Sequence, residues 1–481
     1  MYIKRLITTF SLLLLSPLIF ATDTGSARCE ALRNLELKQA AIQSANELDN
    51  RCEVTVRVWP QQSNADSTFI DVTVWLPHPT MWNQRFLGLG NGGYSPRLPL
   101  EAMASQVAKG FAVGASDTGH QSESLDFVVN AQERIDFWGR SSVHVMREYS
   151  VKLIEAYYQR EPEFNYFAGC STGGHQALAA AQYYPADFDG IVAGAPGHNR
   201  VALNAAFLWL YQQSHQKNTG QPVLSRQDLR QYNQFLLNSC DTLDGSQDGV
   251  ISEPLRCKPD YSALSCEGPE HTGCLTPDKI ERIKRIHEGP VDPITGNQIY
   301  PGFPIGSEFT GQYGWSAYWA DPNDQTQPAR GDFWRYWVFE QTEWNPWEFD
   351  WHSDVQFAQH KLSHRIDAIK ADLSAFFAQG HKLLMYHGMA DPIVPYTDSV
   401  NYYKKVTDSS RWPDDSIASP IALYLIPGMS HCGGGDSLNY FDPLPSLQQW
   451  VEQQIRPQSI DAKEVKNGHI LTVTPITEVS N

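Results

Sequence analysis

Positive charge is scarce in this sequence. Its 481 residues include 37 Lys and Arg against 54 Asp and Glu, which gives a formal net charge of −17 at pH 7. A surface that binds a nucleic-acid backbone needs a field of basic side chains, so this balance argues against a nucleic-acid partner. The acidity itself mainly reports solubility and does not indicate a substrate.

Internal repeats and strong compositional bias are also lacking. Hydrophobic residues make up 41% of the chain, charged residues 19% and aromatic residues 12%. These values are typical of a globular protein and exclude fibrous and low-complexity classes. The length suits one large domain, or one domain with a sizeable insertion, and either can bury a core without metal or disulfides.

The apolar run from Leu6 to Phe20 is too short and too close to the N-terminus for a membrane span. Lys4 and Arg5 precede it and Ala21 ends it, which predicts a secretory signal peptide at residues 1–21. No Cys follows the run directly, so a lipid anchor is not indicated. We therefore expect export to the periplasm or the medium without a membrane anchor.

C-x-x-C pairs are missing too, although the chain has eight cysteines. Their spacings are wide and irregular, which argues against zinc. An even number of cysteines in an exported chain predicts disulfides. All eight lie beyond the signal peptide: Cys29, Cys52, Cys170, Cys240, Cys257, Cys266, Cys274 and Cys432.

The hydrophobic pattern that is present predicts an α/β core. Residues 54–77 alternate in the manner of an edge hairpin, and short apolar runs then alternate with helical segments. The expected buried strands are 86–90, 110–114, 166–169, 191–195, 382–386 and 421–426, and the expected helices are 100–109, 141–161, 173–184, 396–406 and 444–454. This βαβ rhythm favours a parallel sheet.

The rhythm is lost between about residues 198 and 371. This stretch holds four of the cysteines, and residues 303–351 include 15 aromatics among 49 residues, seven of them Trp. We therefore predict an inserted domain at 198–371, with the α/β domain formed by 22–197 and 372–481. Most of the aromatics from Phe303 to Trp351 can form the core of this insertion.

Residues 169–173, Gly-Cys-Ser-Thr-Gly, fit the G-x-S-x-G pattern between a buried strand and a helix. This context indicates a nucleophile elbow, whose tight turn requires glycines and lifts the Ser171 hydroxyl above the sheet. The N-terminus of the following helix would help to hold negative charge. The alternative is an ordinary glycine turn.

A nucleophilic serine in this fold needs an acid and a base, in the chain order Ser, Asp, His. Asp391 follows a buried-strand run, and His431 lies in a glycine-rich segment after the next strand. Each also has a simpler interpretation, because Asp before Pro is common in turns and His among glycines is commonly exposed. We predict Ser171, Asp391 and His431 as a catalytic triad.

The cysteines favour this triad. Cys170 precedes Ser171 and Cys432 follows His431. If Ser171 and His431 are hydrogen-bonded, the two cysteines must be close, and a disulfide between them would join the base to the nucleophile. The other predicted pairs are local: Cys29–Cys52, Cys240–Cys257 and Cys266–Cys274.

An oxyanion hole needs backbone N–H groups. One should come from Thr172, which follows the nucleophile. The other should come from Gly92 or Gly93, in the glycine-rich loop after an early strand. A glycine turn without a catalytic role is the alternative for this loop.

Five segments, GCSTGGHQAL, YPADFDGIVAGAPG, ASDTGH, YHGMADPIVP and IPGMSHCGGG, resemble the tannase and feruloyl esterase family. The resemblance covers nearly all of the mature chain. It implies an α/β-hydrolase core with a large lid domain inserted between Ser171 and Asp391. It also implies hydrolysis of small aromatic esters, because feruloyl and chlorogenate esterases, tannases and the enzyme that cleaves mono(2-hydroxyethyl) terephthalate are in this family. Lid aromatics from Phe303 to Trp351 would then flank the aromatic acyl group, although most of them can equally form the core of the lid.

The resemblance further implies a structural calcium ion (Ca²⁺) in the lid. By position, Asp241, Asp244 and Asp248 would give carboxylates, while Ser246 and Val250 would give main-chain oxygens. Such oxygens suit a hard cation, although the loop lacks the closing Glu of an EF-hand. Without the resemblance, the segment would be interpreted as a solvated turn.

Two histidines in the family-like segments are expected to be structural. His175 lies one turn into the elbow helix, where many relatives have Arg, and His120 belongs to an Asp-Thr-Gly-His segment. An additional cysteine pair that some relatives carry near the C-terminus is also missing. None of these departures affects the triad.

The residue pattern therefore predicts a secreted serine carboxylic-ester hydrolase that works through an acyl-enzyme, and the resemblance implies that its substrates are aromatic acid esters. Two other functions fit parts of the pattern: an acyltransferase or peptidase with the same triad, and a binding protein that keeps the fold without catalysis. No sequence feature selects the acid, the alcohol or an oligomeric state.

Overall fold

A computed structural model describes residues 25–60, 68–217, 219–269, 271–311, 313–410, 419–435 and 437–476. The predicted signal peptide at residues 1–21 lies outside these ranges. Within them, no helix combines the length and apolar character needed to cross a membrane.

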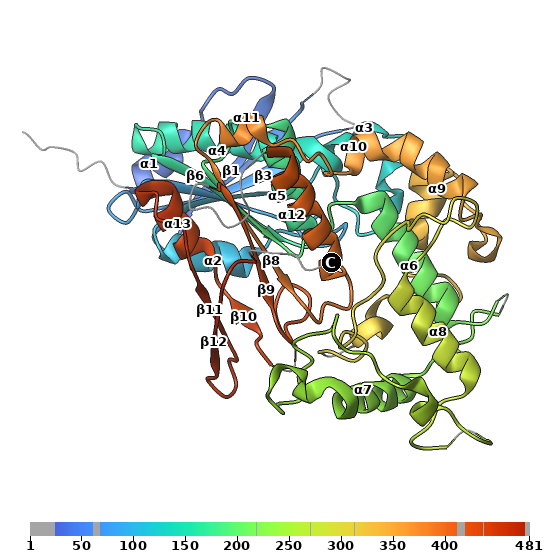
Figure 1. The fold of residues 1–481 in the computed structure, drawn as a ribbon. Helices are drawn as coiled ribbons and strands as arrows, with labels where there is room; N and C mark the ends of the chain where they lie inside the picture. Colours follow the sequence, from blue (N-terminus) through green and yellow to red (C-terminus); the bar gives the residue numbers. More distant parts are fainter. Residues whose placement is uncertain are drawn as a thin grey trace, which may run out of the picture.

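The core is a nine-stranded mixed sheet (Figure 1) with the order β1-β2-β3-β5-β4-β6-β7-β8-β9. The first three neighbouring pairs in this order, β1–β2, β2–β3 and β3–β5, are antiparallel. Every later pair, from β5–β4 to β8–β9, is parallel. The strands are β1 Ala40–Leu48, β2 Arg51–Val58, β3 Ile70–Pro77, β4 Arg85–Leu89, β5 Ala112–Ser116, β6 Phe164–Cys170, β7 Gly190–Gly194, β8 Lys382–Gly388 and β9 Ile421–Ile426.

Helices cover both faces of this sheet because neighbouring strand residues point to opposite sides. Phe167 packs with one hydrophobic cluster and Tyr166 with the other. One face carries α1 Gly25–Leu32, α4 Ser142–Tyr158, α5 Thr172–Tyr183, α11 Ser374–Phe377 and α12 Tyr396–Ser410, and the other carries α2 Leu100–Ala108 and α13 Leu444–Gln453. The α/β fold that the sequence predicts is therefore confirmed, with two helical layers around one sheet.

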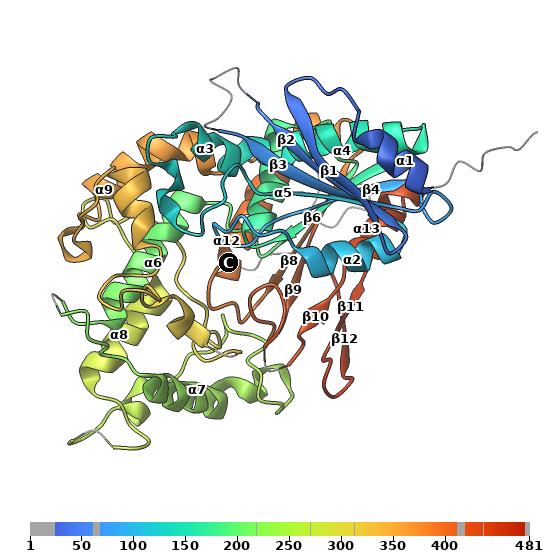
Figure 2. The same cartoon turned by 180° about the vertical axis from the view of Figure 1, so that it is seen from behind.

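The chain between β7 and β8 leaves the sheet and lies to one side of it in both views (Figure 1, Figure 2). It contains α6 Arg200–Ser214, α7 Arg226–Cys240, α8 Pro277–Glu288, α9 Ser353–Ala358 and α10 His364–Ile366. Part of it has its own core, in which Trp315 packs with helix residues such as Tyr232 and Ile283.

A second part of the inserted segment packs directly on the sheet domain. Trp334 and Trp337 share one cluster with Tyr94 and Trp138. The short helix α3 Glu133–Asp136 and the π-helical turn Phe137–Ser141 bring Trp138 to this boundary. Most of the tryptophans in the aromatic-rich stretch therefore hold the lid together or attach it to the sheet domain.

Several elements differ from the expected ones. The hairpin predicted at residues 54–77 is formed by β2 and β3, but it does not lie at the sheet edge, because the unexpected strand β1 pairs with β2 there. The small sheet of β10 Tyr440–Phe441, β11 Ile460–Lys463 and β12 Ile470–Val473 was not expected either. The helix expected at 141–161 is α4, which begins after the π-helical turn. The strand expected at 110–114 is β5, two residues later, because Gly110 takes a positive φ of 90° and ends a turn.

All eight cysteines form disulfides, in the four pairs that the sequence predicts. Cys29–Cys52 ties α1 to β2, and the lid carries Cys240–Cys257 and Cys266–Cys274. Cys170–Cys432 joins residues 262 apart, with 5.7 Å between their Cα atoms.

Candidate active site

Ser171 occupies the sharp turn between β6 and α5, with φ 64° and ψ −117°. A Cβ added to Gly169 would lie 2.5 Å from the backbone of Gly173, and one added to Gly173 would lie 3.2 Å from Gly90 Cα. Both glycines are needed because the backbone segments almost touch. The sequence prediction of a strained turn between strand and helix is therefore confirmed.

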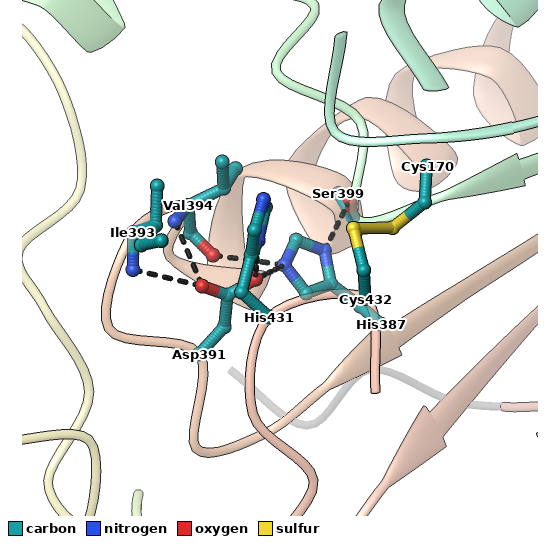
Figure 3. Close-up of a disulfide and its surroundings, with 8 residues drawn as sticks. All are labelled: Cys170, His387, Asp391, Ile393, Val394, Ser399, His431 and Cys432. Carbon is teal, nitrogen blue, oxygen red and sulfur yellow. Dashed lines mark hydrogen bonds and ion pairs between the residues drawn. A yellow bond between two sulfur atoms is a disulfide. The ribbon is translucent and has the colours of Figure 1, made fainter. Parts of the chain in front are cut away.

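Asp391 follows β8 and His431 follows β9, at the same edge of the sheet. His431 Nδ1 lies 2.7 Å from Asp391 Oδ2 (Figure 3). Ser171 and His431 line one cavity. Among the described residues, Ser171 Oγ has no hydrogen-bond partner, and catalytic hydrogen bonds are commonly long in structures without substrate.

The Cys170–Cys432 disulfide connects the residues beside Ser171 and His431 (Figure 3). Both cysteines also line the cavity. Since each is the direct chain neighbour of a predicted catalytic residue, the disulfide limits how far the serine and the histidine can separate.

The Asp391 carboxylate is fully buried and accepts four hydrogen bonds. Its Oδ1 accepts from the backbone N–H groups of Ile393 (2.8 Å) and Val394 (2.9 Å). Its Oδ2 contacts His431 and, at 3.1 Å, Nε2 of His387. Burial alone would raise the pKa of Asp391, but the two histidines and their hydrogen bonds hold that pKa well below its usual range.

His387 is a residue that the sequence analysis did not single out. Its Nε2 faces two acceptors, Asp391 Oδ2 and the Val394 carbonyl at 2.8 Å, so this nitrogen must carry the proton. Its Nδ1 lies 2.8 Å from Ser399 Oγ, whose hydroxyl then donates to it. The position four residues before Asp391 is the signal that could have identified it.

Two of the predicted oxyanion donors, Gly92 and Gly93, line this cavity, and the third, Thr172, is buried directly after Ser171. Thr172 is the first residue of α5, so its N–H has no partner within the helix. In the facing loop, Gly90 N–H donates to Ala168 and Asn91 N–H to Gln176 Oε1. No acceptor for the N–H groups of Gly92 or Gly93 is found within the described part of the chain, and both glycines line the cavity.

The cavity has a volume of about 510 Å³. It is lined by Gly90, Asn91, Gly92, Gly93, Tyr94, Ser95, Glu123, Cys170, Ser171, Tyr318, Arg330, His431 and Cys432. Of the aromatics between residues 303 and 351, only Tyr318 reaches this wall, so the expectation that several of them flank the acyl group is wrong for this cavity. A neighbouring cavity of about 390 Å³ shares Glu123, Tyr318 and Arg330 with it.

The predicted calcium loop lies at the end of α7. Asp241 is buried and accepts from the backbone N–H groups of Gly249 and Val250, while Asp244 Oδ1 accepts from Ser246 N–H. The donor atoms are oxygens, which suit Ca²⁺. Within the described ranges, however, no three acidic, His or Cys side chains gather as a metal-binding group.

His175 and His120 are both packed inside the protein, as expected for structural residues. His175 Nε2 donates to the Ile366 carbonyl at 2.7 Å. His120 stacks on Phe127, and its Nδ1 donates to the Ser122 carbonyl at 2.8 Å. Burial lowers the pKa of His120 to about 4 and that of His175 well below the usual value, so both rings are neutral at pH 7.

Comparison with known proteins gives one consistent result. Residues 52–477 match the family model described as "Tannase and feruloyl esterase". The chain is 30% identical to an uncharacterized esterase of Xanthomonas campestris pv. campestris, over 93% of this chain and 86% of that protein. It is also 30% identical to a probable feruloyl esterase B-1 of Aspergillus flavus, over 87% of this chain and 79% of that protein.

Solved structures show the same likeness. Feruloyl esterase B from Aspergillus oryzae superposes with a TM-score of 0.84 at 25% identity, covering 94% of this chain and 95% of that one. Tannin acyl hydrolase from Aspergillus niger, at 18% identity, shares the fold with a TM-score of 0.75 over 94% and 91% of the two chains.

Proposed function

The chain belongs to the tannase and feruloyl esterase family of carboxylic ester hydrolases, and we propose that it cleaves esters of aromatic acids through Ser171, His431 and Asp391. The observation that carries this proposal is the arrangement at one sheet edge. A strained serine and a histidine line one cavity, and the histidine is hydrogen-bonded to a buried carboxylate.

The reaction has two halves. His431 Nε2 takes the proton of Ser171 Oγ while that oxygen bonds to the ester carbonyl carbon, whose oxygen becomes negative. The C–O bond to the alcohol then breaks, and the alcohol leaves with the proton from His431. Water, deprotonated by His431, attacks the acyl-enzyme, and the acid leaves as Ser171 regains its proton.

Asp391 fixes the histidine for both halves. Its Oδ2 accepts from His431 Nδ1, which leaves the lone pair on Nε2 free for the serine proton. The negative carbonyl oxygen would be stabilised by Thr172 N–H and by the unoccupied N–H of Gly92 or Gly93.

The cavity supports an aromatic substrate. Its volume of about 510 Å³ lies in the usual range for small-molecule sites. Tyr94 from the sheet domain and Tyr318 from the lid contribute aromatic side chains to its lining, which suit an aromatic ring.

The test is hydrolysis of a panel: methyl gallate, methyl ferulate, chlorogenate, mono(2-hydroxyethyl) terephthalate and p-nitrophenyl acetate, with Ser171→Ala in parallel. We expect activity on at least one aromatic ester and its loss in the variant. Folded protein that cleaves none of them would contradict the proposal. Product analysis with an added alcohol acceptor separates hydrolysis from acyl transfer.

We further propose that the 241–250 loop binds Ca²⁺ through Asp241, Asp244 and Asp248 with the Ser246 and Val250 carbonyls. Its support is the all-oxygen donor set and the family membership. We expect elemental analysis of dialysed protein to give one Ca²⁺ per chain and EGTA to lower the melting temperature. Unchanged melting in EGTA, with no bound metal, would contradict the proposal.

Export is proposed on the residue pattern at 1–21 and on the four disulfides, which form in oxidising compartments. We expect protein recovered from periplasm or medium to begin at Thr22. An intact Met1 N-terminus on the folded protein would contradict this.

A further inference from the structure

Arg200, the first residue of α6, is a buried cation that the mechanism above does not use. It is 4% exposed, and among the described residues no carboxylate lies within ion-pair distance of its guanidinium. Its Nη2 donates to Thr172 Oγ1 at 3.0 Å, and its Nε is buried without an acceptor in the described chain. An arginine side chain stays charged in proteins, so this charge is left without a neutralising partner.

The surroundings of Arg200 connect it to the wall of the cavity. Its guanidinium carbon lies 5.0 Å from the Trp138 ring centroid and 5.5 Å from that of Tyr94, which lines the cavity. After burial, the Arg200 charge is the next strongest cause of the low pKa of the nearby His175. The positive charge of Arg200 therefore acts on the groups around it.

Leaving a charge buried and unpaired is costly, and a neutral side chain could fill the same space. The position of Arg200 offers a compensation. Thr172, which it contacts, is the chain neighbour of Ser171 and the expected oxyanion donor. In a site with few mobile dipoles, a fixed positive charge acts most strongly when negative charge develops beside it.

We propose that Arg200 is a positioning residue of the oxyanion hole, which holds Thr172 and gives the site the permanent positive potential that stabilises the tetrahedral oxyanion. This inference rests on the proposed esterase mechanism. A purely structural Arg200, stacked on Trp138 and Tyr94, would stabilise the fold and leave the chemical step unaffected.

The test compares Arg200→Met, which removes the charge at similar length, with the matched control Arg200→Lys. The measurements are kcat and KM on the best aromatic ester, inactivation by a phosphonate that leaves a tetrahedral anionic adduct on Ser171, and thermal unfolding. Removing one oxyanion donor typically costs 10²- to 10³-fold. For a charge behind the donor, we expect Arg200→Met to lower kcat and the phosphonate rate about 10- to 100-fold, with KM within twofold.

Arg200→Lys keeps the positive charge, so it should retain most of the kcat and phosphonate rate that Arg200→Met loses. Equal losses in both variants that follow their melting temperatures, or a wild-type kcat in Arg200→Met, would overturn the proposal.

If Arg200→Met does not fold, Thr172→Val removes the hydroxyl that accepts from Arg200, and Thr172→Ser keeps it. We then expect a several-fold lower kcat in Thr172→Val alone, and equal rates in the two would overturn the proposal. Ser171→Ala separates the outcomes, because its full activity would contradict the esterase mechanism itself.

Discussion

Asp391 and Asp117 are both buried aspartates that lie within three residues of the end of a strand of the main sheet, yet they are held in opposite states of ionisation. Asp391, after β8, accepts four N–H groups. Asp117, after β5, accepts two backbone N–H groups on Oδ1, from Asp71 (3.0 Å) and Gly119 (2.9 Å). Its Oδ2 is buried and has no partner in the described chain.

The difference appears in their pKa values. Burial raises the pKa of Asp117 to about 8, whereas the pKa of Asp391 is held well below its usual range in spite of burial. Donors on the second oxygen, and two imidazoles in particular, decide between the two outcomes. Asp391 is therefore an anion at pH 7, as the orienting group of a triad must be, while Asp117 retains its proton.

Removing the anion should have the largest effect. Asp391→Asn keeps the shape of the side chain but replaces one carboxylate oxygen with an NH₂ group. The amide therefore cannot accept hydrogen bonds from His431 and His387 while its oxygen accepts from the backbone N–H groups. We expect kcat on the best aromatic ester to fall about 10³- to 10⁴-fold, as for other triads that lose this carboxylate. Steady-state kinetics measure this loss, and a melting curve is the control for correct folding. A loss below tenfold in folded protein would mean that Asp391 does not orient His431.

Removing His387 should make Asp391 more like Asp117. His387→Leu removes one hydrogen-bond donor from Asp391 Oδ2, so we expect the pKa of Asp391 to rise toward its usual value. We expect kcat to fall about 10- to 100-fold, which is typical for the loss of a residue that orients a functional side chain through a hydrogen bond. His387→Gln is the matched control, because its amide nitrogen can still donate to Oδ2, and it should keep more of the rate.

The same pair gives a test by pH. A carboxylate with a depressed pKa contributes stability above its unfolded pKa of about 3.9, and this is lost as pH falls through the folded pKa. The stability that His387→Leu loses should therefore be largest near pH 6 and shrink toward pH 3, as measured by urea unfolding. A loss independent of pH would show that His387 only fills space.

Sequence patterns predicted the parts of the fold that depend on local periodicity. The buried strands around Phe167, Ile191 and Leu383 have apolar runs because both of their faces are covered. Strand β1 has no such run, because it lies at the sheet edge with several exposed residues, such as Glu47 and Leu48. The strands β10, β11 and β12 have only 2, 4 and 4 residues, and several of these are exposed, so the strands resemble loops in sequence.

The site follows the same division. The common location of Ser171, Asp391 and His431 at one edge of the sheet could be predicted because glycines and strand ends mark these residues along the chain. Arg200 could not, because only the fold brings it to Thr172, 28 residues earlier in the chain. Aromatic content likewise predicted a lid rich in Trp but not that Tyr318 alone faces the cavity, because packing decides which rings point inward.

Asp117→Asn should change stability and leave the triad unaffected. The raised pKa of Asp117 means that the folded protein keeps a proton on this carboxyl that the unfolded chain releases above about pH 4. The stability of the wild type therefore falls as the pH rises from about 4 to 8. Asn cannot ionise, and its oxygen can still accept from Asp71 and Gly119. We expect the variant to gain stability relative to wild type by about 2–5 kcal/mol over this range.

Urea unfolding at pH 5, 7 and 8.5 measures this gain, with kcat as the control for an intact triad. A difference that stays constant from pH 5 to 8.5 would show that Asp117 is already ionised in the folded protein, and the contrast with Asp391 would disappear.

The smallest effect is expected at Ser399, which reaches Asp391 only through His387. Ser399→Ala removes the hydroxyl that donates to His387 Nδ1, at a cost of about 1 kcal/mol in stability and a several-fold lower kcat. Residues in one hydrogen-bond chain are not additive. Ser399→Ala in the His387→Leu background should therefore cause no further loss of kcat, whereas losses that multiply would mean that Ser399 acts on the site by another route.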